Sequence, residues 1–268
     1  MEGANLSLAR HWGEGKVPVM CAKAAELVRE KPDVIAVSTA SALREVQRVA
    51  GKTPVVFWDV SDPVGNKFVQ SEARPGANIT GFSLYSYEMA GKWLQLLKEA
   101  APRTKRVLVV MNSANPNLPG WLRATDAAAG SLGVAAVRVQ MNDMAEVENA
   151  INSFAREPAG GLLVLPDPFL TAHADRIVRL AEQHRLPAIY GSADFVAKGG
   201  LLGYSVDRSD LPKRAAGYVS RILKGESPDN LPVQAPSKFE FTLNAKAAKA
   251  IGVRFPQAMM LRADKVIE

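Results

Sequence analysis

The sequence lacks several features that would assign a protein to a class at once. It has a single cysteine, Cys21, among 268 residues, so no disulfide can form within the chain. No apolar run approaches the roughly 20 residues that a membrane-spanning helix needs. Residues 1–5 lack the basic and apolar segments of a secretory signal, so the polypeptide as written is expected to stay in the cytoplasm.

Motifs of catalysis and metal binding are also missing. The sequence has no G-x-G-x-x-G and no P-loop lysine motif, which are the usual signatures of nucleotide phosphate binding. Its histidines, His11, His173 and His184, are isolated, and no Cys/His cluster has the spacing of zinc ligands. Residues 203–207 begin like a nucleophile elbow but lack the final glycine. We therefore expect no enzymatic activity, no cofactor and no metal ion.

The charge pattern argues against a nucleic-acid partner. The net charge is +6, but Lys and Arg are scattered and form no dense run with interleaved aromatic residues. We therefore expect a solvated basic surface. An apolar content of 47% and a charged content of 22% are typical of a globular protein, and the length suits one large or two ordinary domains.

Apolar runs alternate with helix-like stretches along most of the chain. Strands that alternate with helices in this way predict an α/β protein with parallel sheets. The rhythm occurs twice, with a break near 79–86, which predicts two similar lobes with a cleft between them. The expected strands are 5–10, 34–37, 55–58, 79–84, 107–111, 135–139, 162–165, 188–190, 201–204 and an edge-like 239–243. The expected helices include 63–72 and 172–184.

Four of the expected strands end in polar turns, at 38–41, 59–63, 112–116 and 166–168. A parallel sheet brings such turns to one edge, where the N-termini of the following helices offer N–H groups and partial positive charge. This pattern predicts binding of a ligand with a carboxylate or another acceptor group. Asp59 and Asp62 could mimic paired carboxylates, but a turn residue and a helix cap are the favoured interpretation.

Several segments resemble the signature of a known family. D-P-V-G at 62–65, followed by A-R-P-G-A-N-I-T-G at 73–81, resembles the pattern of substrate-binding proteins of the tryptophan/tyrosine-transporter type. Members of this family are extracytoplasmic receptors of ABC importers. The later segments that agree with the family are 165–169, 185–190, 199–204, 222–225, 229–233, 238–241 and 262–267.

The resemblance implies a type I periplasmic-binding fold with two doubly wound parallel-sheet lobes. Lobe one would comprise 1–83 and 205–235, and lobe two 84–204 and 236–268. A small amino-acid-like or carboxylate ligand would bind between the lobes, which close by a hinge motion. An ABC permease in the membrane would recognise the closed form, and the protein would work in the periplasm or another extracytoplasmic space. The alternatives are a ligand-sensing module of a regulatory system, or an α/β enzyme acting on a small anionic substrate.

The resemblance also carries over ligand-binding residues. In lobe one, hydroxyl and N–H groups of Ser38, Thr39 and Ala40 would hold a carboxylate, or simply cap a helix. Asp62 would contact the ligand or act as a cap. Trp58 and Asp59 depart from the family pattern, which usually has small or aliphatic residues there, so ligand choice is expected to differ if they reach the cleft.

In lobe two, Asn112 and Asn115 match a strand-end turn that faces the cleft. Asp167 would receive a ligand ammonium, on which the ring of Phe169 would stack. Tyr190 and Tyr204 end later strands and would line the pocket or belong to the core.

Family members carry a first strand and a first helix before the segment that matches Glu2 onward. The strand lies in the middle of lobe one, so its loss leaves ladder groups unpaired at ~1–3 kcal/mol per buried group. We therefore expect a truncated lobe one, unless the flanking strands close up. Such a chain is expected to be marginally stable or to associate with itself through this incomplete lobe.

Overall fold

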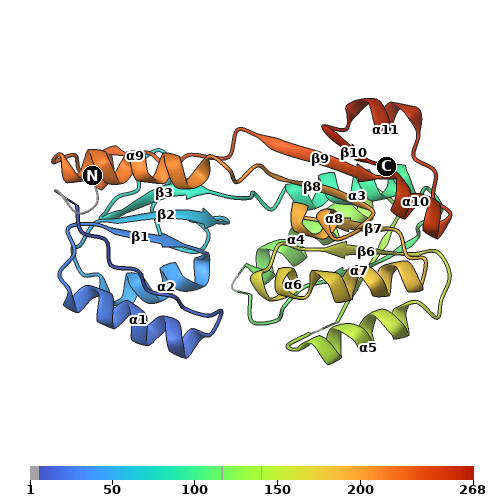
Figure 1. Ribbon diagram of the computed structural model, residues 1–268, viewed down its shortest axis with the longest axis horizontal. Coiled ribbons are helices and arrows are strands. Elements are labelled where there is room, and N and C mark those ends of the chain that lie inside the picture. Colours follow the sequence, from blue (N-terminus) through green and yellow to red (C-terminus); the bar gives the residue numbers. More distant parts are fainter. Residues whose placement is uncertain (1–5, 116, 140) are drawn as a thin grey trace. The chain divides into compact units, whose positions relative to one another are not determined.

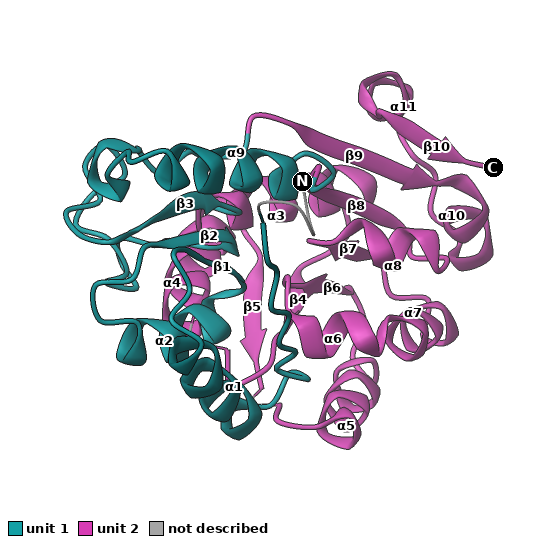
Figure 2. Ribbon diagram, turned by 60° about the vertical axis from the view of Figure 1, so that its left-hand side comes forward, with its two compact units in different colours: residues 1–85, 208–236 teal, residues 86–207, 237–268 magenta. Residues whose placement is uncertain are grey.

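The computed structural model describes residues 6–115, 117–139 and 141–268 (Figure 1). The chain forms two compact units, which Figure 2 shows in different colours. Unit 1 comprises Met1–Tyr85 and Arg208–Pro236, and unit 2 comprises Ser86–Asp207 and Ser237–Glu268. The chain therefore passes between the units three times. No helix of the described residues is long and apolar enough to cross a bilayer.

Unit 1 is built on a three-stranded parallel sheet in the order β1-β2-β3. The strands are β1 (Ile35–Ser38), β2 (Val55–Val60) and β3 (Ile79–Ser83). The helices are α1 (Val17–Arg29), α2 (Ala40–Val49) and α9 (Leu211–Leu223), with a 3-10 turn η1 (Pro228–Asn230). In Figure 1, α1 and α2 lie on one face of this sheet and α9 on the other, so the unit is doubly wound.

The motif at 73–81 allows β2 and β3 to approach each other closely. Gly81 pairs with Phe57 across the ladder. A Cβ at Gly81 would overlap the backbone carbonyl of Phe57. Any side chain here would push the strands apart, and the glycine of the motif is therefore required by packing.

Unit 2 contains a seven-stranded sheet in the order β10-β9-β8-β7-β6-β4-β5. Only the β8–β9 pair is antiparallel among the pairs that the structure describes. Its strands are β4 (Arg106–Val110), β5 (Ala135–Arg138), β6 (Gly160–Val164), β7 (Ala188–Tyr190), β8 (Leu202–Val206), β9 (Phe239–Asn244) and β10 (Lys265–Ile267).

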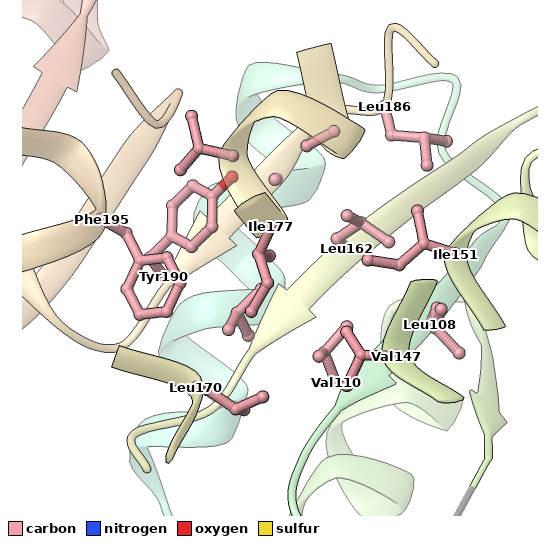
Figure 3. Packing of buried hydrophobic residues seen from close by; sticks show 14 of the residues in the cluster. Leu108, Val110, Val147, Ile151, Leu162, Leu170, Ile177, Leu186, Tyr190 and Phe195 are labelled. Atoms are coloured by element: carbon pink, nitrogen blue, oxygen red, sulfur yellow. The ribbon is translucent and has the colours of Figure 1, made fainter. Parts of the chain in front are cut away.

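Helices cover both faces of this sheet (Figure 1). They are α3 (Met89–Ala100), α4 (Leu118–Ser131), α5 (Met144–Phe154), α6 (Pro168–Ala172), α7 (Ala174–Gln183), α8 (Ala193–Ala197), α10 (Ala245–Ile251) and α11 (Gln257–Arg262). On one face, side chains such as Leu108 and Leu162 of the strands pack against Val147, Ile151 and Ile177 of α5 and α7 (Figure 3). The α/β class with parallel sheets is confirmed.

Two of the expected elements in unit 1 are wrong. No strand forms over residues 6–10, where only Leu6 takes part in a single bridge and every residue is exposed. The alternating pattern has no buried face to support a strand there. Residues 63–72 form turns instead of a helix. The Phe68 and Val69 N–H groups both donate to the Pro63 carbonyl, and Lys67 has a φ of 59°, so the helical hydrogen-bond ladder is not made.

Three expectations in unit 2 need correction. The single helix expected at 172–184 begins earlier, and His173 divides it into α6 and α7. The edge-like strand at 239–243 is β9, an interior strand between β8 and β10. The helix α11 and strand β10 near the C-terminus were missed, because a three-residue strand carries almost no periodic signal.

Candidate functional site

Backbone strain gathers at the carboxyl edge of the sheet in unit 1. Thr39, Asp59 and Asp62 all have positive φ values, of 72°, 62° and 43°. Such conformations are unfavourable for residues other than glycine, and they cost more for Thr39 than for the two aspartates, since Asp enters the left-handed region more readily. They persist only where the surrounding structure imposes them, and they are typical of binding and switch regions. This edge is therefore a candidate site on conformational grounds alone.

The turn after β1 starts helix α2. The Thr39 N–H donates to the carbonyl of Trp58 at 3.3 Å, and the Thr39 hydroxyl accepts a 3.4 Å hydrogen bond from the Ala42 N–H. Thr39 is therefore an N-cap, which is the alternative left open by the sequence. Ala40 is buried and offers only its backbone. Ser38 is half-exposed, and its hydroxyl has no hydrogen-bond partner among the described residues.

Asp62 closes the D-P-V-G turn. Its carboxylate Oδ1 accepts the Gly65 N–H at 2.8 Å, and a Cβ at Gly65 would overlap this carboxylate. The Asn66 side chain donates to the carbonyls of Ser61 and Asp62, and Arg44 of α2 donates to the Asn66 carbonyl. The motif is therefore a self-contained turn attached to α2, and Asp62 acts as its cap.

Asp59 lies on an irregularity within strand β2, whereas the sequence pattern predicted that this residue would be in a turn. The register against β3 shifts between Phe57 and Val60, as in a β-bulge. Arg208, next to the start of α9, forms an ion pair with Asp59, with 3.4 Å between Nη2 and Oδ1. Burial raises the pKa of the Asp59 carboxyl, and the positive charge of Arg208 acts in the opposite direction. The departure from the family pattern was the only sequence signal for this pair.

In unit 2, two of the predicted residues are brought together. The Asn115 side chain donates a 2.8 Å hydrogen bond to Oδ2 of Asp167. Oδ1 of Asp167 accepts the N–H groups of Phe169 and Leu170 at the start of α6, at 2.9 and 3.2 Å. Asp167 is only 6% exposed. The turns after β4 and β6 are therefore joined by a buried, hydrogen-bonded carboxylate.

Two further predicted residues lie next to Asn115 and Asp167: Asn112 is in the turn after β4, and Phe169 is in α6. The Asn112 side chain accepts the Ala114 N–H at 3.0 Å, and Asn112 forms a parallel bridge with Met141 after β5. Phe169 is half-buried and contacts the ring of His173 edge-on, with centroids 4.9 Å apart. Pro166 and Asp167 follow β6, whereas Pro116 of the N-x-x-N-P turn lies outside the described residues.

The two tyrosines differ in their positions, because Tyr190 is the last residue of β7 whereas Tyr204 is inside β8. Tyr190 is 1% exposed and stacks on Phe195 within the core of unit 2, at 4.8 Å (Figure 3). Burial raises the pKa of its hydroxyl. Tyr204 lies in the middle of β8 and stacks on Phe239 of β9 at 5.6 Å. For Tyr190, the structure favours the core alternative over a place in the pocket.

The described residues contain no group of three or more His, Cys, Asp or Glu side chains that is arranged to hold a metal ion. The site residues that the structure places are hydroxyl, amide and carboxylate groups on turns, with one half-buried aromatic ring. Within each unit, such groups can form hydrogen bonds with a small polar molecule.

The chain was compared with known protein families. Residues 4–267 match the model of the family described as ABC transporter substrate binding protein. A curated protein of Clostridioides difficile (strain R20291), the tyrosine-binding protein, is 25% identical over 254 residues. That alignment covers 94% of this chain and 72% of the relative.

Solved structures show the same fold. A conserved domain protein from Vibrio cholerae O1 biovar eltor has a TM-score of 0.93 and is 26% identical, covering 99% of this chain and 88% of that one. A domain from Streptococcus pneumonia, solved in complex with L-Trp, has a TM-score of 0.88 at 22% identity. This second match covers 95% of this chain and 85% of the other.

Proposed function

The chain belongs to the ABC transporter substrate-binding protein family, and from this we propose that it is the solute receptor of an ABC importer for an amino acid. The observation that carries the proposal is the family match over residues 4–267. The ligand class is supported by the relative named for tyrosine binding and by the similar structure that holds L-Trp. The family match favours this function over a sensory module.

Each unit, taken by itself, carries groups that suit part of an amino acid. The α2 N-terminus, with Ser38 and Thr39, offers N–H and hydroxyl donors for a carboxylate. Phe169 offers a half-exposed ring against which an apolar or aromatic side chain can pack. Asn112 and Asn115 hold the neighbouring turns in shape. The role is therefore binding, and we propose no catalytic step.

Calorimetric titration with L-Tyr, L-Trp, L-Phe and L-Leu, and with ribose as a sugar control, tests this proposal. The wild-type protein is expected to show saturable binding to at least one amino acid. Phe169→Ala should weaken that binding by roughly 3–10-fold through loss of ring packing. Phe255→Ala is the matched control, because this ring is half-buried like that of Phe169 and is not among the expected ligand-binding residues. Absence of binding to every amino acid would contradict the proposal.

The family implies a place outside the cytoplasm and a membrane permease as partner, and we propose both for this protein. Fractionation of cells that produce the protein from its native gene tests the location. Recovery in the cytoplasm alone would count against the role of an importer receptor.

We also propose self-association through unit 1. The outer edge of β1 pairs with no other strand among the described residues. Leu8, Trp12 and Val17, on the chain before β1, are exposed by 47%, 76% and 53%. An open strand edge is a template for pairing with a second copy, and exposed apolar side chains of the same unit would add to the area that such a contact buries. Sedimentation velocity over a concentration series should show dimers, and a monomer at every concentration would refute this association.

A further inference from the structure

Asp59 is the charged residue of unit 1 whose position is hardest to explain by folding alone. It is held at a φ of 62° on an irregularity of β2, close to the carboxyl end of that strand. Figure 1 labels the strand β2. Bulges next to binding sites commonly turn a side chain to a new direction. The unusual backbone conformation at Asp59 is therefore consistent with a functional role for its carboxylate.

The two oxygens of this carboxylate differ. Oδ1 is buried and accepts no hydrogen bond, and it faces Arg208 at 3.4 Å. Oδ2 is not among the fully buried unsatisfied oxygens, and it also accepts no hydrogen bond from the described residues. The side chain keeps 21% of its exposure, so Oδ2 is the oxygen that solvent reaches. Arg208 therefore orients one oxygen and leaves the other open.

Asp167, the residue first expected to receive a ligand ammonium, is bonded differently. Its two oxygens accept three hydrogen bonds, from the Phe169 and Leu170 backbone and from Asn115. Those bonds cap α6 and join two turns, and the side chain is 6% exposed. Asp167 thus serves the fold of unit 2, whereas Asp59 has an oxygen ready to accept a new donor.

We propose that Asp59 accepts the ammonium group of the ligand and that Arg208 is a positioning residue for it. This inference rests on the proposed amino-acid-binding function and names the group that selects the ammonium. A carboxylate that accepts an ammonium N–H forms one of the stronger hydrogen bonds in proteins. A partly desolvated carboxylate strengthens the bond further, because water competes less for the same donor.

The test compares each amino acid that the wild-type protein binds with its des-amino analogue, for example L-Tyr with 3-(4-hydroxyphenyl)propionate. The wild-type protein should favour the amino acid. Asp59→Asn should weaken amino-acid binding by about 10–100-fold and leave binding of the analogue within about 3-fold, so that the preference collapses. Asn tolerates a positive φ well, which makes this variant conservative for the backbone.

The matched control is Asp229→Asn, which changes another carboxylate of unit 1 that already accepts a backbone N–H, that of Gly76. It should leave the preference for the ammonium unchanged. Arg208→Gln should reduce the preference less than Asp59→Asn, and Arg208→Lys should restore part of it. The effects of Arg208→Gln and Asp59→Asn should not add in the double variant, because both act through the same carboxylate.

The outcomes separate the inference from the proposed function. Failure of the wild-type protein to bind any amino acid would overturn both. If the wild-type protein binds an amino acid and the Asp59→Asn variant still prefers that amino acid over its des-amino analogue, the inference alone is overturned. If Asp59→Asn weakens binding of the amino acid and of its analogue equally, the inference is also overturned. That result would indicate that the ion pair between Asp59 and Arg208 has only a structural role. If Asp59→Asn does not fold, Asp59→Ser gives the same comparison.

Discussion

At the scale of single residues, the carboxylates at the strand ends differ in how completely their oxygens are bonded. Asp167 accepts three hydrogen bonds and Asp62 accepts one from Gly65. Asp59 accepts none from the described residues and has only the ion pair with Arg208. The residue type is the same in all three cases, so their roles follow from their local geometry.

Asp167→Ala is expected to lower the free energy of unfolding by about 2–3 kcal/mol, because it removes a helix cap and leaves the Asn115 side chain without its acceptor. Asp143→Ala is the matched control. Asp143 caps α5 through the Glu146 N–H but is exposed, so its loss should cost about 1 kcal/mol. Urea unfolding measures both values. Equal losses would show that the bond to Asn115 contributes nothing.

The raised pKa of Asp59 predicts a pH dependence of stability. The folded-state pKa of this carboxyl lies above its ordinary value of 3.8, because burial disfavours the charged form. Its stabilising contribution is therefore present below about pH 4 and is lost as the pH rises through the folded-state pKa. Asp59→Asn carries no such titration. The melting temperature of the variant minus that of the wild type should increase between about pH 4 and pH 7, and a difference that falls with pH would contradict this.

At the scale of elements, the sequence pattern located most of the strands, but it failed at residues 6–10 and predicted a helix at 63–72 where turns form. Val55–Val60 is mostly apolar, which is typical of a strand buried on both faces. Ile79–Ser83 is buried throughout, although Thr80 and Ser83 are polar. Residues 63–72 contain a cap residue and a proline that suit a helix start, yet they form turns. The carboxylate of Asp62 bonds to Gly65 and the Pro63 carbonyl accepts from Phe68, which closes the segment locally.

Gly81→Ala tests the close approach of β2 and β3. The added Cβ would overlap the carbonyl of Phe57, so the free energy of unfolding should fall by about 3 kcal/mol or more. Gly217→Ala is the control, because Gly217 is exposed within α9 and its Cβ would meet no atom within 4 Å. It should stabilise the protein by about 1 kcal/mol. Chemical unfolding measures both, and a neutral Gly81→Ala would refute the packing argument.

At the scale of the whole molecule, the chain crosses between two units that each have a core of their own. One cluster of buried residues includes Leu43 of α2 with strands β1 and β2. Another includes Leu162 of β6 with α5 and α7. Each unit uses two separate stretches of the chain, so neither could be cut out as one continuous segment.

The separate cores predict separate responses to mutation. Leu43→Ala and Leu162→Ala each remove a fully buried side chain and should cost about 2–5 kcal/mol. In amide hydrogen exchange, each variant should lose protection mainly within its own unit. Leu261→Ala, at a side chain that is 78% exposed, should change nothing. A uniform loss of protection over both units would show that they unfold as one.

The sequence by itself determined the α/β class and the family, because both depend on local periodicity and on motifs that are continuous along the chain. It also placed Asn115 and Asp167 near one sheet edge, which the parallel order of strands requires.

Only the tertiary structure decided the roles of the individual residues. In the folded chain, Tyr190 is buried in the core and both oxygens of Asp167 accept hydrogen bonds. One oxygen of Asp59 is exposed to solvent and accepts no hydrogen bond from the described residues. Those differences depend on burial, on the register shift in β2 and on the ion pair between Asp59 and Arg208, which are 149 positions apart in the sequence. Contacts between such distant residues leave no periodic trace in the sequence, so they could be read only from the folded chain.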